Sequence, residues 1–356
     1  MPSQLISADR EVKCSDRMKI QIRSPFTILF ILLSLLVVVV CIGLRVDEVT
    51  RRSAVHGVLD LRGYDLDSQP AVEFGGEWAF FGRHLLEPKD FQTELAPAPD
   101  GFLTLPGSWK GQSFGGQTLG GNGFATLQLK VLSAPAQALL AIRIAGVYSA
   151  YRLWANGRLV AESGRVGASL NDEVMDHSLR LGALRVDGEA IDLVLQVSCF
   201  HMDKVGLPTL QLGRYADLNA AQNRTWGLAL FSAGTLLLMG IYHIALYVLY
   251  RSNRSPLYFG VYCLVWMAFV ISNTTSDWAI RVFLPDLAGE TLVRTSLFYY
   301  AVAAPLSYHV FRSLYPQEFP HWLLVVFWGL GGLYAMVAIA APMTSASALL
   351  PFFHLF

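Results

Sequence analysis

Charge is scarce in this sequence. Only 15% of its 356 residues are charged, 53% are hydrophobic, and the mean hydropathy is +0.42. A composition this poor in charge is not that of an ordinary soluble protein, and it predicts membrane segments. Lys plus Arg equals Asp plus Glu at 27 each, so there is no basic excess for nucleic acid and no acidic excess for a basic partner. We therefore expect no nucleic-acid partner.

Cysteine is scarce as well. Cys14, Cys41, Cys199 and Cys263 are scattered, without CxxC or metal-type spacing. This count and spacing support neither a disulfide scaffold nor a zinc site. The G-x-S-x-G nucleophile elbow of a serine hydrolase is also missing. We predict no catalytic residues, no metal and no cofactor.

The first long apolar segment is residues 25–44, about 20 residues without a charge, which is enough to cross a bilayer core of about 30 Å. The preceding residues 1–24 are basic, which places them in the cytoplasm by the positive-inside rule. A cleaved signal peptide is the alternative, but the run exceeds the usual apolar region of one, and no A-x-A-like site follows it before Arg45. We favour a transmembrane signal anchor.

A second hydrophobic block fills residues 225–356 and predicts part of a helix bundle. Its spans are residues 226–250, 257–273, 295–311, 322–341 and an incomplete 346–356. With a cytoplasmic N-terminus, the basic turn of Arg251 and Arg254 also lies in the cytoplasm, as the positive-inside rule requires. We expect a multi-pass protein of the inner membrane. The final run, "SALLPFFHLF", supplies about half a span, so we expect the chain to be a C-terminally truncated fragment.

Residues 45–224 have the composition of a soluble domain, and on this topology they are periplasmic. Residues 126–131 and 191–197 alternate polar and apolar, which predicts strands that each bury one face. Asn156-Gly157 between two apolar segments predicts a β-hairpin with a type I′ turn. The fold class we predict is an α+β multi-domain membrane protein, with an all-β jelly-roll or sandwich domain outside the membrane and an all-α transmembrane helix bundle.

A set of segments carries a resemblance. In order they are GGEWAFF (75–81), LLEPKDF (85–91), LPGSW (105–109), GFATLQLKV (123–131), IAGVYSAYRLWANGRLVAESGRVG (144–167), LQVSCFHMDKVGL (195–207) and GIYHIALYVLYRSNRSPLYFGVYCLVWM (240–267). The first six resemble the galactose-binding-like jelly-roll extracellular domain of bacterial seven-transmembrane receptors with diverse intracellular signalling modules. The last resembles the seven-helix core of that family, and no single motif is diagnostic.

The resemblance implies a sensory receptor for signal transduction. Its outer domain would sense a ligand of the carbohydrate class, and its helices would pass the state to a downstream cytoplasmic signalling module, such as a kinase or a cyclase, that this chain does not contain. The partners expected are therefore a small-molecule or carbohydrate ligand, the lipid bilayer and that module. A homodimer is left open.

A sugar site usually combines an aromatic face with convergent polar groups. The candidates in the outer domain are Trp109, Arg152, Trp154, His201 and Asp203. Trp109 also fits a core residue at a strand end, and Trp154 also fits packing across the hairpin. His201 and Asp203 follow a strand, in a loop where binding residues concentrate. One His near one Asp is too little for a metal site.

An envelope enzyme acting on glycans is the alternative function. A glycosidase needs two carboxyl groups about 5 to 9.5 Å apart. Nothing in the sequence spacing of Glu73, Glu77, Glu162 and Asp203 pairs them across a cleft. A transporter is a third class, but it predicts charges near the membrane midplane that most of these spans lack.

Two features of the membrane block remain open. His243 and His309 are polar candidates inside spans, for which a hydrogen bond between helices is the plainer interpretation. A charged cluster lies in the outward-facing loop between the second and third helices of the block, and it comprises Asp277, Arg281, Asp286, Glu290 and Arg294. It either docks the outer domain onto the bundle or is a solvated loop.

Overall fold

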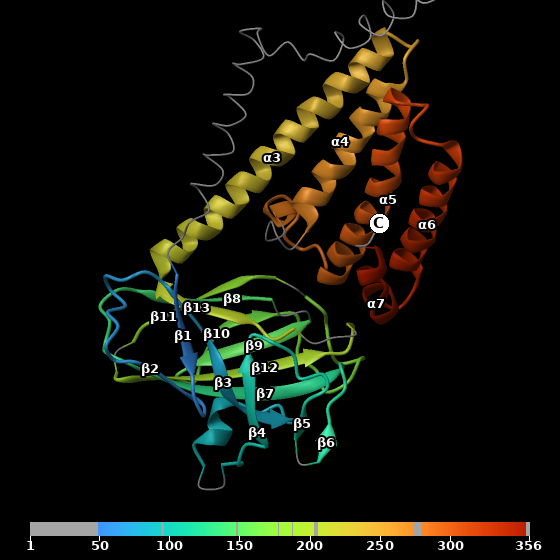
Figure 1. Ribbon diagram of the computed structural model, residues 1–356. Coiled ribbons are helices and arrows are strands. Elements are labelled where there is room, and N and C mark those ends of the chain that lie inside the picture. Colours follow the sequence, from blue (N-terminus) through green and yellow to red (C-terminus); the bar gives the residue numbers. More distant parts are fainter. Residues whose placement is uncertain are drawn as a thin grey trace, which may run out of the picture. The chain divides into compact units, whose positions relative to one another are not determined.

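The computed structural model describes residues 49–93, 96–114, 116–146, 149–176, 178–186, 188–202, 206–273 and 279–353, with the side chains of residues 347 and 350–353 left out. The predicted anchor at residues 25–44 therefore lies outside the described residues, as do Asp203 and Asp277. Figure 1 shows a β-sheet domain followed in the chain by a group of helices.

The N-terminal part of the described chain is built of strands. Their bounds are β1 Thr50–Ala54, β2 Val58–Leu61, β3 Val72–Gly82, β4 Gly101–Leu105, β5 Ser113–Phe114, β6 Gln117–Thr118, β7 Gly123–Ser133, β8 Leu140–Ala145, β9 Ala150–Ala155, β10 Arg158–Ser163, β11 Arg180–Leu184, β12 Ala190–Cys199 and β13 Thr209–Arg214, with a short 3-10 helix η2 at Pro88–Phe91. Eleven of them form one sheet in the order β10-β9-β12-β7-β3-β13-β8-β11, with β1 and β4 also paired to β3 and β2 to β7. β5 and β6 form a separate two-stranded sheet.

Strand β3 changes neighbours in its middle. Its first half pairs with β1 and β13, and its second half pairs with β4 and β7. Gly75 and Gly76 lie at the change. Gly76 has a φ of +88°, and a Cβ on Gly75 would lie 2.2 Å from the carbonyl oxygen of Leu105. Glycine here lets one strand serve both halves of the sheet, because no side chain obstructs the bend.

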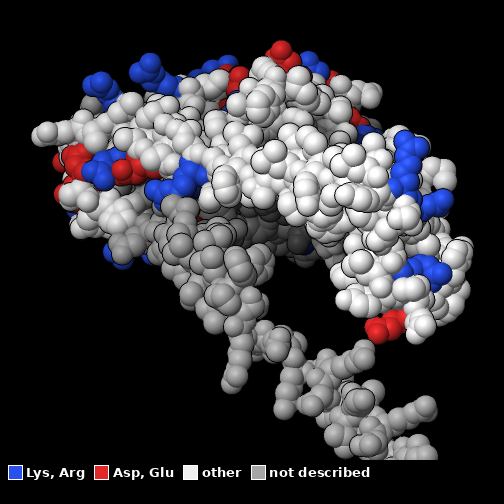
Figure 2. Space-filling view, turned by 90° about the horizontal axis from the view of Figure 1, so that it is seen from above, with Lys and Arg blue, Asp and Glu red and all other residues white. Residues whose placement is uncertain are grey.

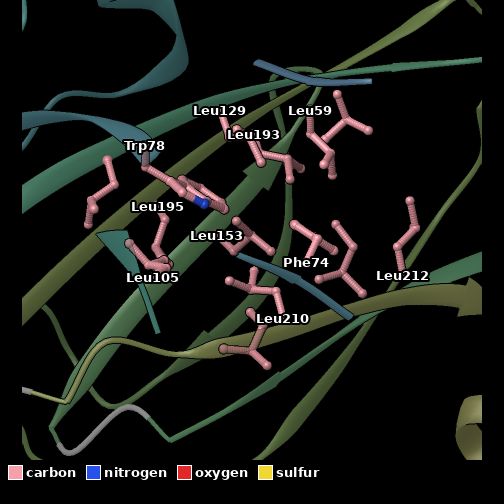
Figure 3. Packing of buried hydrophobic residues seen from close by; sticks show 14 of the residues in the cluster. Leu59, Phe74, Trp78, Leu105, Leu129, Leu153, Leu193, Leu195, Leu210 and Leu212 are labelled. Carbon is pink, nitrogen blue, oxygen red and sulfur yellow. The ribbon is translucent and has the colours of Figure 1, made fainter. Parts of the chain in front are cut away.

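The sheet curls around one core. A Cβ on Gly182 of β11 would lie 2.7 Å from the carbonyl oxygen of Val160 of β10, so the two ends of the strand order approach each other closely. Trp78 is fully buried inside, with its ring stacked parallel to Phe74 at 6.5 Å between centroids. Figure 3 shows leucines of several strands meeting around them. A core of this size is sufficient to hold the strands together through apolar burial.

The hairpin prediction is confirmed. Asn156 and Gly157 connect β9 and β10 with φ angles of 48° and 79°, and Arg158 pairs with Ala155. The one-face prediction for residues 191–197 is wrong, because Val194 and Gln196 are buried as well as their alternating neighbours. β12 is central in the sheet, and a segment covers its second face, where Gln196 Nε2 donates to the carbonyl oxygen of Leu86 at 3.0 Å.

The helices follow β13 directly. Their bounds are α3 Tyr215–Leu249, α4 Ser255–Ser272, η4 Ala279–Val282, α5 Gly289–Leu314, α6 His321–Ala340 and α7 Met343–Phe353. α3 begins 11 residues before the predicted residue 226, because its first three turns are polar and a hydropathy criterion passes over them. Their sequence is nonetheless rich in good helix formers, chiefly alanine.

Among the described helices, α3, α4 and α6 are long and apolar enough to cross a membrane. In Figure 2 a broad uncharged surface extends over the helical part, with charged residues at its margins. Such a surface is stable in lipid, where no water is available to solvate charge. The chain thus combines a large β-sheet domain with membrane-type helices, which is the predicted α+β class.

Candidate ligand-sensing and coupling site

The two candidate tryptophans lie on different faces of the sheet. Trp109 is 3% exposed and belongs to the core, where its ring centroid lies 6.2 Å from that of Phe80. Trp154 is 6% exposed, and its strand neighbours Leu153 and Ala155 point into the core instead. The structure therefore does not bring the two rings together, and neither offers an open aromatic face.

Arg152 covers the Trp154 ring. Its guanidinium carbon lies 5.0 Å from the ring centroid, within the range of a cation–π contact. Its Nε also lies 3.5 Å from Oε2 of Glu162 on β10. Arg152 and Trp154 are two residues apart on β9, so they share one face of the strand. This trio holds the hairpin together, which is the packing interpretation of Trp154.

His201 lies beside a carboxylate that the sequence did not single out. Its Nδ1 is 2.9 Å from Oε2 of Glu173, and the Glu173 side chain is completely buried. The same carboxylate accepts hydrogen bonds from the hydroxyls of Ser149 and Ser198 and from the backbone N–H of Phe200, at 2.7 to 2.8 Å. A buried carboxylate is stable only when its acceptor sites are filled in this way.

Glu173 therefore joins two parts of the sheet domain. It fixes the end of β12, at Ser198 to His201, to the loop that runs between β10 and β11. No sequence signal pointed to it, because the contacts of a single glutamate in a polar loop depend on the tertiary fold. Burial excludes Glu173 from direct contact with a substrate, so its role is to position the loop and His201. The proposed neighbour of His201, Asp203, lies outside the described residues.

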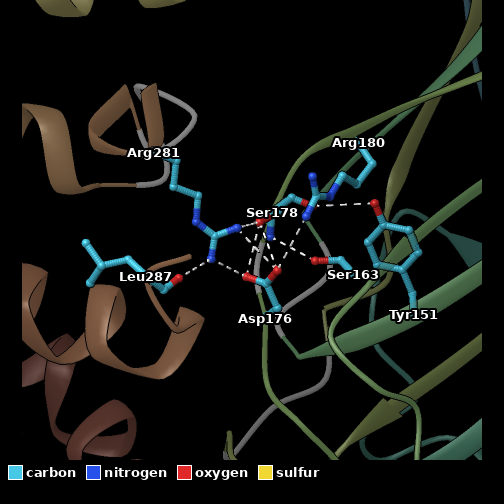
Figure 4. Close-up of polar contacts among 7 residues, drawn as sticks. All are labelled: Tyr151, Ser163, Asp176, Ser178, Arg180, Arg281 and Leu287. Carbon is cyan, nitrogen blue, oxygen red and sulfur yellow. Dashed lines mark hydrogen bonds and ion pairs between the residues drawn. The ribbon is translucent and has the colours of Figure 1, made fainter. Parts of the chain in front are cut away.

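The same loop continues to Asp176, which meets the helical part of the chain (Figure 4). Nη2 of Arg281, in η4, lies 2.7 Å from Oδ1 of Asp176, and Nη1 lies 3.2 Å from Oδ2, a bidentate arrangement. Arg281 also donates to the hydroxyl of Ser178 and, at 3.0 Å, to the carbonyl oxygen of Leu287. A planar guanidinium fork suits this pairing, because it satisfies both carboxylate oxygens at once.

The backbone of this loop also approaches α5 closely. A Cβ on Gly289, the first residue of α5, would lie 2.7 Å from the Cα of Asp176. Met175 is 4% exposed and belongs to an apolar cluster with Leu297, Tyr334 and Met343 of α5, α6 and α7. Residues 173–176 are thus held by the sheet at one end and by the helices at the other.

Of the charged loop cluster, Arg281 is a described member that contacts the sheet domain. Arg294 instead pairs with Glu290 at 2.8 Å and donates to the carbonyl oxygens of Ala338 and Ala341 at the end of α6. Of the two interpretations of this loop, docking onto the outer domain or a solvated loop, the structure shows docking for Arg281. The sequence left it undecided because charge position alone does not reveal the partner.

The two histidines of the predicted spans each contact an aromatic ring of a neighbouring helix. His243 Nδ1 is 2.8 Å from the carbonyl oxygen of Met239 in α3, and its ring is 4.6 Å from that of Phe259 in α4. The ring of His309 in α5 is 4.2 Å from that of Tyr258 in α4. The expected hydrogen bond between helices is therefore wrong for His243, whose hydrogen bond stays within α3, and Nδ1 of His309 has no hydrogen-bond partner among the described residues. Only the ring contacts reach the neighbouring helix.

A glycosidase pair is not formed by Glu77 and Glu162. They lie on β3 and β10, with β7, β12 and β9 between them in the sheet order. Around the curled sheet in the other direction β13, β8 and β11 also separate them, and both side chains point away from the core that their neighbours Trp78 and Ala161 enter, so they do not converge on one cleft as glycoside hydrolysis requires. Glu77 is moreover occupied by the backbone N–H of His56 at 2.9 Å.

Residues 226–356 match a family model described as 7TM diverse intracellular signalling. The match begins within α3 and includes η4, and with it Arg281. No curated protein matches the chain. Together with the apolar helices, the family match shows a membrane protein with a helical domain similar to that of these signalling proteins.

Solved structures similar to this chain include two β-glucuronidases. That of Faecalibacterium prausnitzii is 17% identical, with a TM-score of 0.29, and the match covers 40% of this chain and 31% of that structure. That of Ruminococcus gnavus is 12% identical, with a TM-score of 0.32, and the match covers 42% of this chain and 29% of that structure. The chain thus spans about a third of the length of these structures, and the likeness is distant.

The 7TM match gives the Asp176–Arg281 contact its significance. Asp176 lies before the matched range and Arg281 lies inside it. The ion pair therefore joins the β-sheet domain to the helical domain that matches the family model.

Proposed function

We propose that this protein is a transmembrane sensory receptor of the bacterial inner membrane. Its β-sheet domain senses a ligand in the periplasm, and its helices pass the state of that domain to a cytoplasmic output module. The observation that carries the proposal is the contact of Asp176 with Arg281, because it physically joins a loop of the sheet domain to helices similar to those of 7TM signalling proteins.

The contact is suited to transmission. Residues 173–176 are too short to absorb a displacement, and both ends are held: Glu173 by four donors of the sheet domain, Asp176 by Arg281. A ligand that binds one arrangement of this loop more tightly than another shifts the equilibrium between them. The shift reaches η4 and the start of α5 through the guanidinium of Arg281 and the close backbone approach at Gly289.

The ligand class we propose is a carbohydrate. The support is the resemblance of the strand segments to galactose-binding-like domains. The periplasmic placement is supported by the basic turn at Arg251 and Arg254, which is exposed between α3 and α4 and favours the cytoplasmic side.

Hydrogen exchange on the full chain in lipid nanodiscs tests the receptor proposal. We expect at least one sugar from a panel of neutral and acidic envelope saccharides to slow amide exchange both in the sheet domain and in residues 279–294. Arg281→Gln should retain the first change and lose the second. Arg254→Gln, an exposed arginine in the α3–α4 turn, is the matched control and should retain both.

Two results would count against the proposal. One is a panel in which no sugar alters exchange anywhere in the sheet domain. The other is a sugar that protects the sheet domain of the wild-type chain while α5 and η4 exchange at unchanged rates.

A further inference from the structure

A groove of about 470 Å³ lies on the sheet domain, away from the Asp176 loop. The tip of the β9–β10 hairpin, the end of β11 and the loop before β12 form its walls, and its lining includes Leu139, Asn156, Arg158, Leu159 and Arg185. Its volume falls in the range of about 300 to 1,000 Å³ that small-molecule sites occupy. None of the sequence candidates for ligand binding lines it.

Two arginines of the groove are available for a ligand. Arg158 and Arg185 are both exposed, and neither has an ion-pair or hydrogen-bond partner among the residues that the structure describes. Other arginines of the same domain are paired, for example Arg51 with Glu73 and Arg62 with Asp60. Two unpaired guanidinium groups on one groove favour an anion, which they can bind through charge-assisted bidentate hydrogen bonds.

A β-bulge in β10 turns a leucine toward the groove. The register of β10 against β9 shifts between Leu159 and Ala161. In a regular strand Leu159 would share the inward face with Ala161, which is buried, but the extra residue turns Leu159 outward, where it is 43% exposed. Arg158 and Leu159 consequently both face solvent. Leu139, 44% exposed, adds a second apolar residue to the groove.

The groove is bounded by two closely packed strands and is hydrogen-bonded to the start of helix α3. The approach of Gly182 to the carbonyl oxygen of Val160 fixes β10 against β11. The carbonyl oxygen of Leu139 accepts a hydrogen bond at 2.9 Å from the backbone N–H of Tyr215, the first residue of α3. A ligand in the groove would therefore contact Leu139, which directly precedes β8 and is hydrogen-bonded to the first residue of α3.

We propose that this groove is the ligand site of the receptor, and that its ligand is an acidic sugar. A carboxylate of the sugar binds Arg158 and Arg185, and a C–H face of the ring lies on Leu139 and Leu159. The proposal rests on the proposed receptor function and names its ligand class. The anionic group could also come from a lipid headgroup or from an inorganic anion, and the experiment separates these sources.

The test is calorimetric titration of the full chain in phosphatidylcholine nanodiscs with D-galacturonate, D-galactose and sodium sulfate. We expect galacturonate to bind at least tenfold more tightly than galactose or sulfate. Arg158→Gln and Arg185→Gln should each weaken galacturonate binding by about tenfold or more, the scale of one hydrogen bond to a charged group. Arg52→Gln, an exposed arginine of β1, is the matched control and should leave the affinity unchanged.

Three results would overturn the assignment. Galacturonate could fail to bind, or bind equally well to the Arg158 and Arg185 variants. Sulfate could match it, which would indicate a site for bare anions. Finally, nanodiscs containing phosphatidylglycerol could abolish galacturonate binding through the same arginines, which would indicate a headgroup site.

The groove and the receptor proposals can fail separately. Titration measures binding alone, whereas hydrogen exchange in η4 and α5 measures transmission. Arginine-dependent galacturonate binding without any change in the amide exchange of the helices would support the groove as a ligand site and contradict the receptor function. If a different sugar changes the amide exchange of the helices while galacturonate does not bind, the receptor function would be supported and the groove would be rejected as the site of an acidic sugar.

Discussion

Asp176 and Arg281 are 105 residues apart in the sequence, yet their side chains meet at 2.7 Å. Both are largely shielded from water, with 16% and 17% of the side chains exposed. Shielding reduces the screening of the pair, and the bidentate geometry fixes the mutual orientation of its two groups. The pair is thus a specific contact, in contrast to the solvated ion pairs elsewhere on the sheet domain.

A double-mutant cycle should detect this pair in the stability of the chain. We expect Asp176→Asn and Arg281→Gln each to lower the free energy of unfolding, because each leaves a shielded partner unsatisfied. The double variant should lose less than the sum, by about 1 to 3 kcal/mol. Denaturant titration of the full chain in micelles measures it. The same cycle on Arg51 and Glu73, whose arginine is 83% exposed, should give about 0.5 kcal/mol or less. Additive losses at Asp176 and Arg281 would contradict a specific contact.

Glu173→Gln should destabilise the sheet domain by about 2 to 4 kcal/mol, although the side chains are nearly identical in shape. The carboxylate accepts from four donors, whereas an amide replaces one acceptor oxygen with an NH₂ group that faces other donors. Chemical denaturation followed by tryptophan fluorescence measures the loss. Glu162→Gln, on a half-exposed side chain, is the matched control and should change stability by less than about 0.5 kcal/mol. Equal effects of the two substitutions would refute the structural role of Glu173.

Gly76→Ala should cost far more than Gly111→Ala, although both glycines have positive φ angles of 88° and 82°. A Cβ at Gly76 would lie 2.4 Å from the backbone of Ala54, so β1 would have to move, whereas a Cβ at Gly111 meets nothing within 4 Å. Gly111→Ala should cost about 1 kcal/mol from backbone strain alone, and Gly76→Ala several times as much. The unfolding midpoints of the two variants compare them directly, and similar midpoints would contradict the close packing of β1 on β3.

The parts of the fold that could be predicted are those specified by short sequence patterns. Asn156-Gly157 specifies its own turn through the φ angles it allows, and the long apolar runs specify membrane helices through length and hydropathy. The burial of both faces of β12 could not be predicted this way, since it depends on which segments lie over the sheet. The polar first turns of α3 were missed for the same reason: they carry no local hydrophobic signal.

The candidate site was harder to predict than the fold. Trp109 and Trp154 attracted attention as aromatic residues, and the structure gives them packing roles. Glu173 and Asp176, which link the sheet domain internally and to the helices, occupy an unremarkable polar loop. Their significance comes from partners more than twenty residues away, such as His201 and Arg281. Arg158 and Arg185 likewise became notable only once the fold placed them on one groove.

Strand β13 ends at Arg214 and helix α3 begins at Tyr215, without an intervening linker. The 35 residues of α3 form a rod about 52 Å long, more than the thickness of a bilayer core. Because no flexible linker separates β13 from α3, a rotation of the strand is passed on to the helix. The sheet domain is therefore connected to the helices in two ways that differ in stiffness. One is the continuous backbone from β13 into α3, and the other is the Asp176–Arg281 ion pair, which can break and re-form while the backbone stays intact.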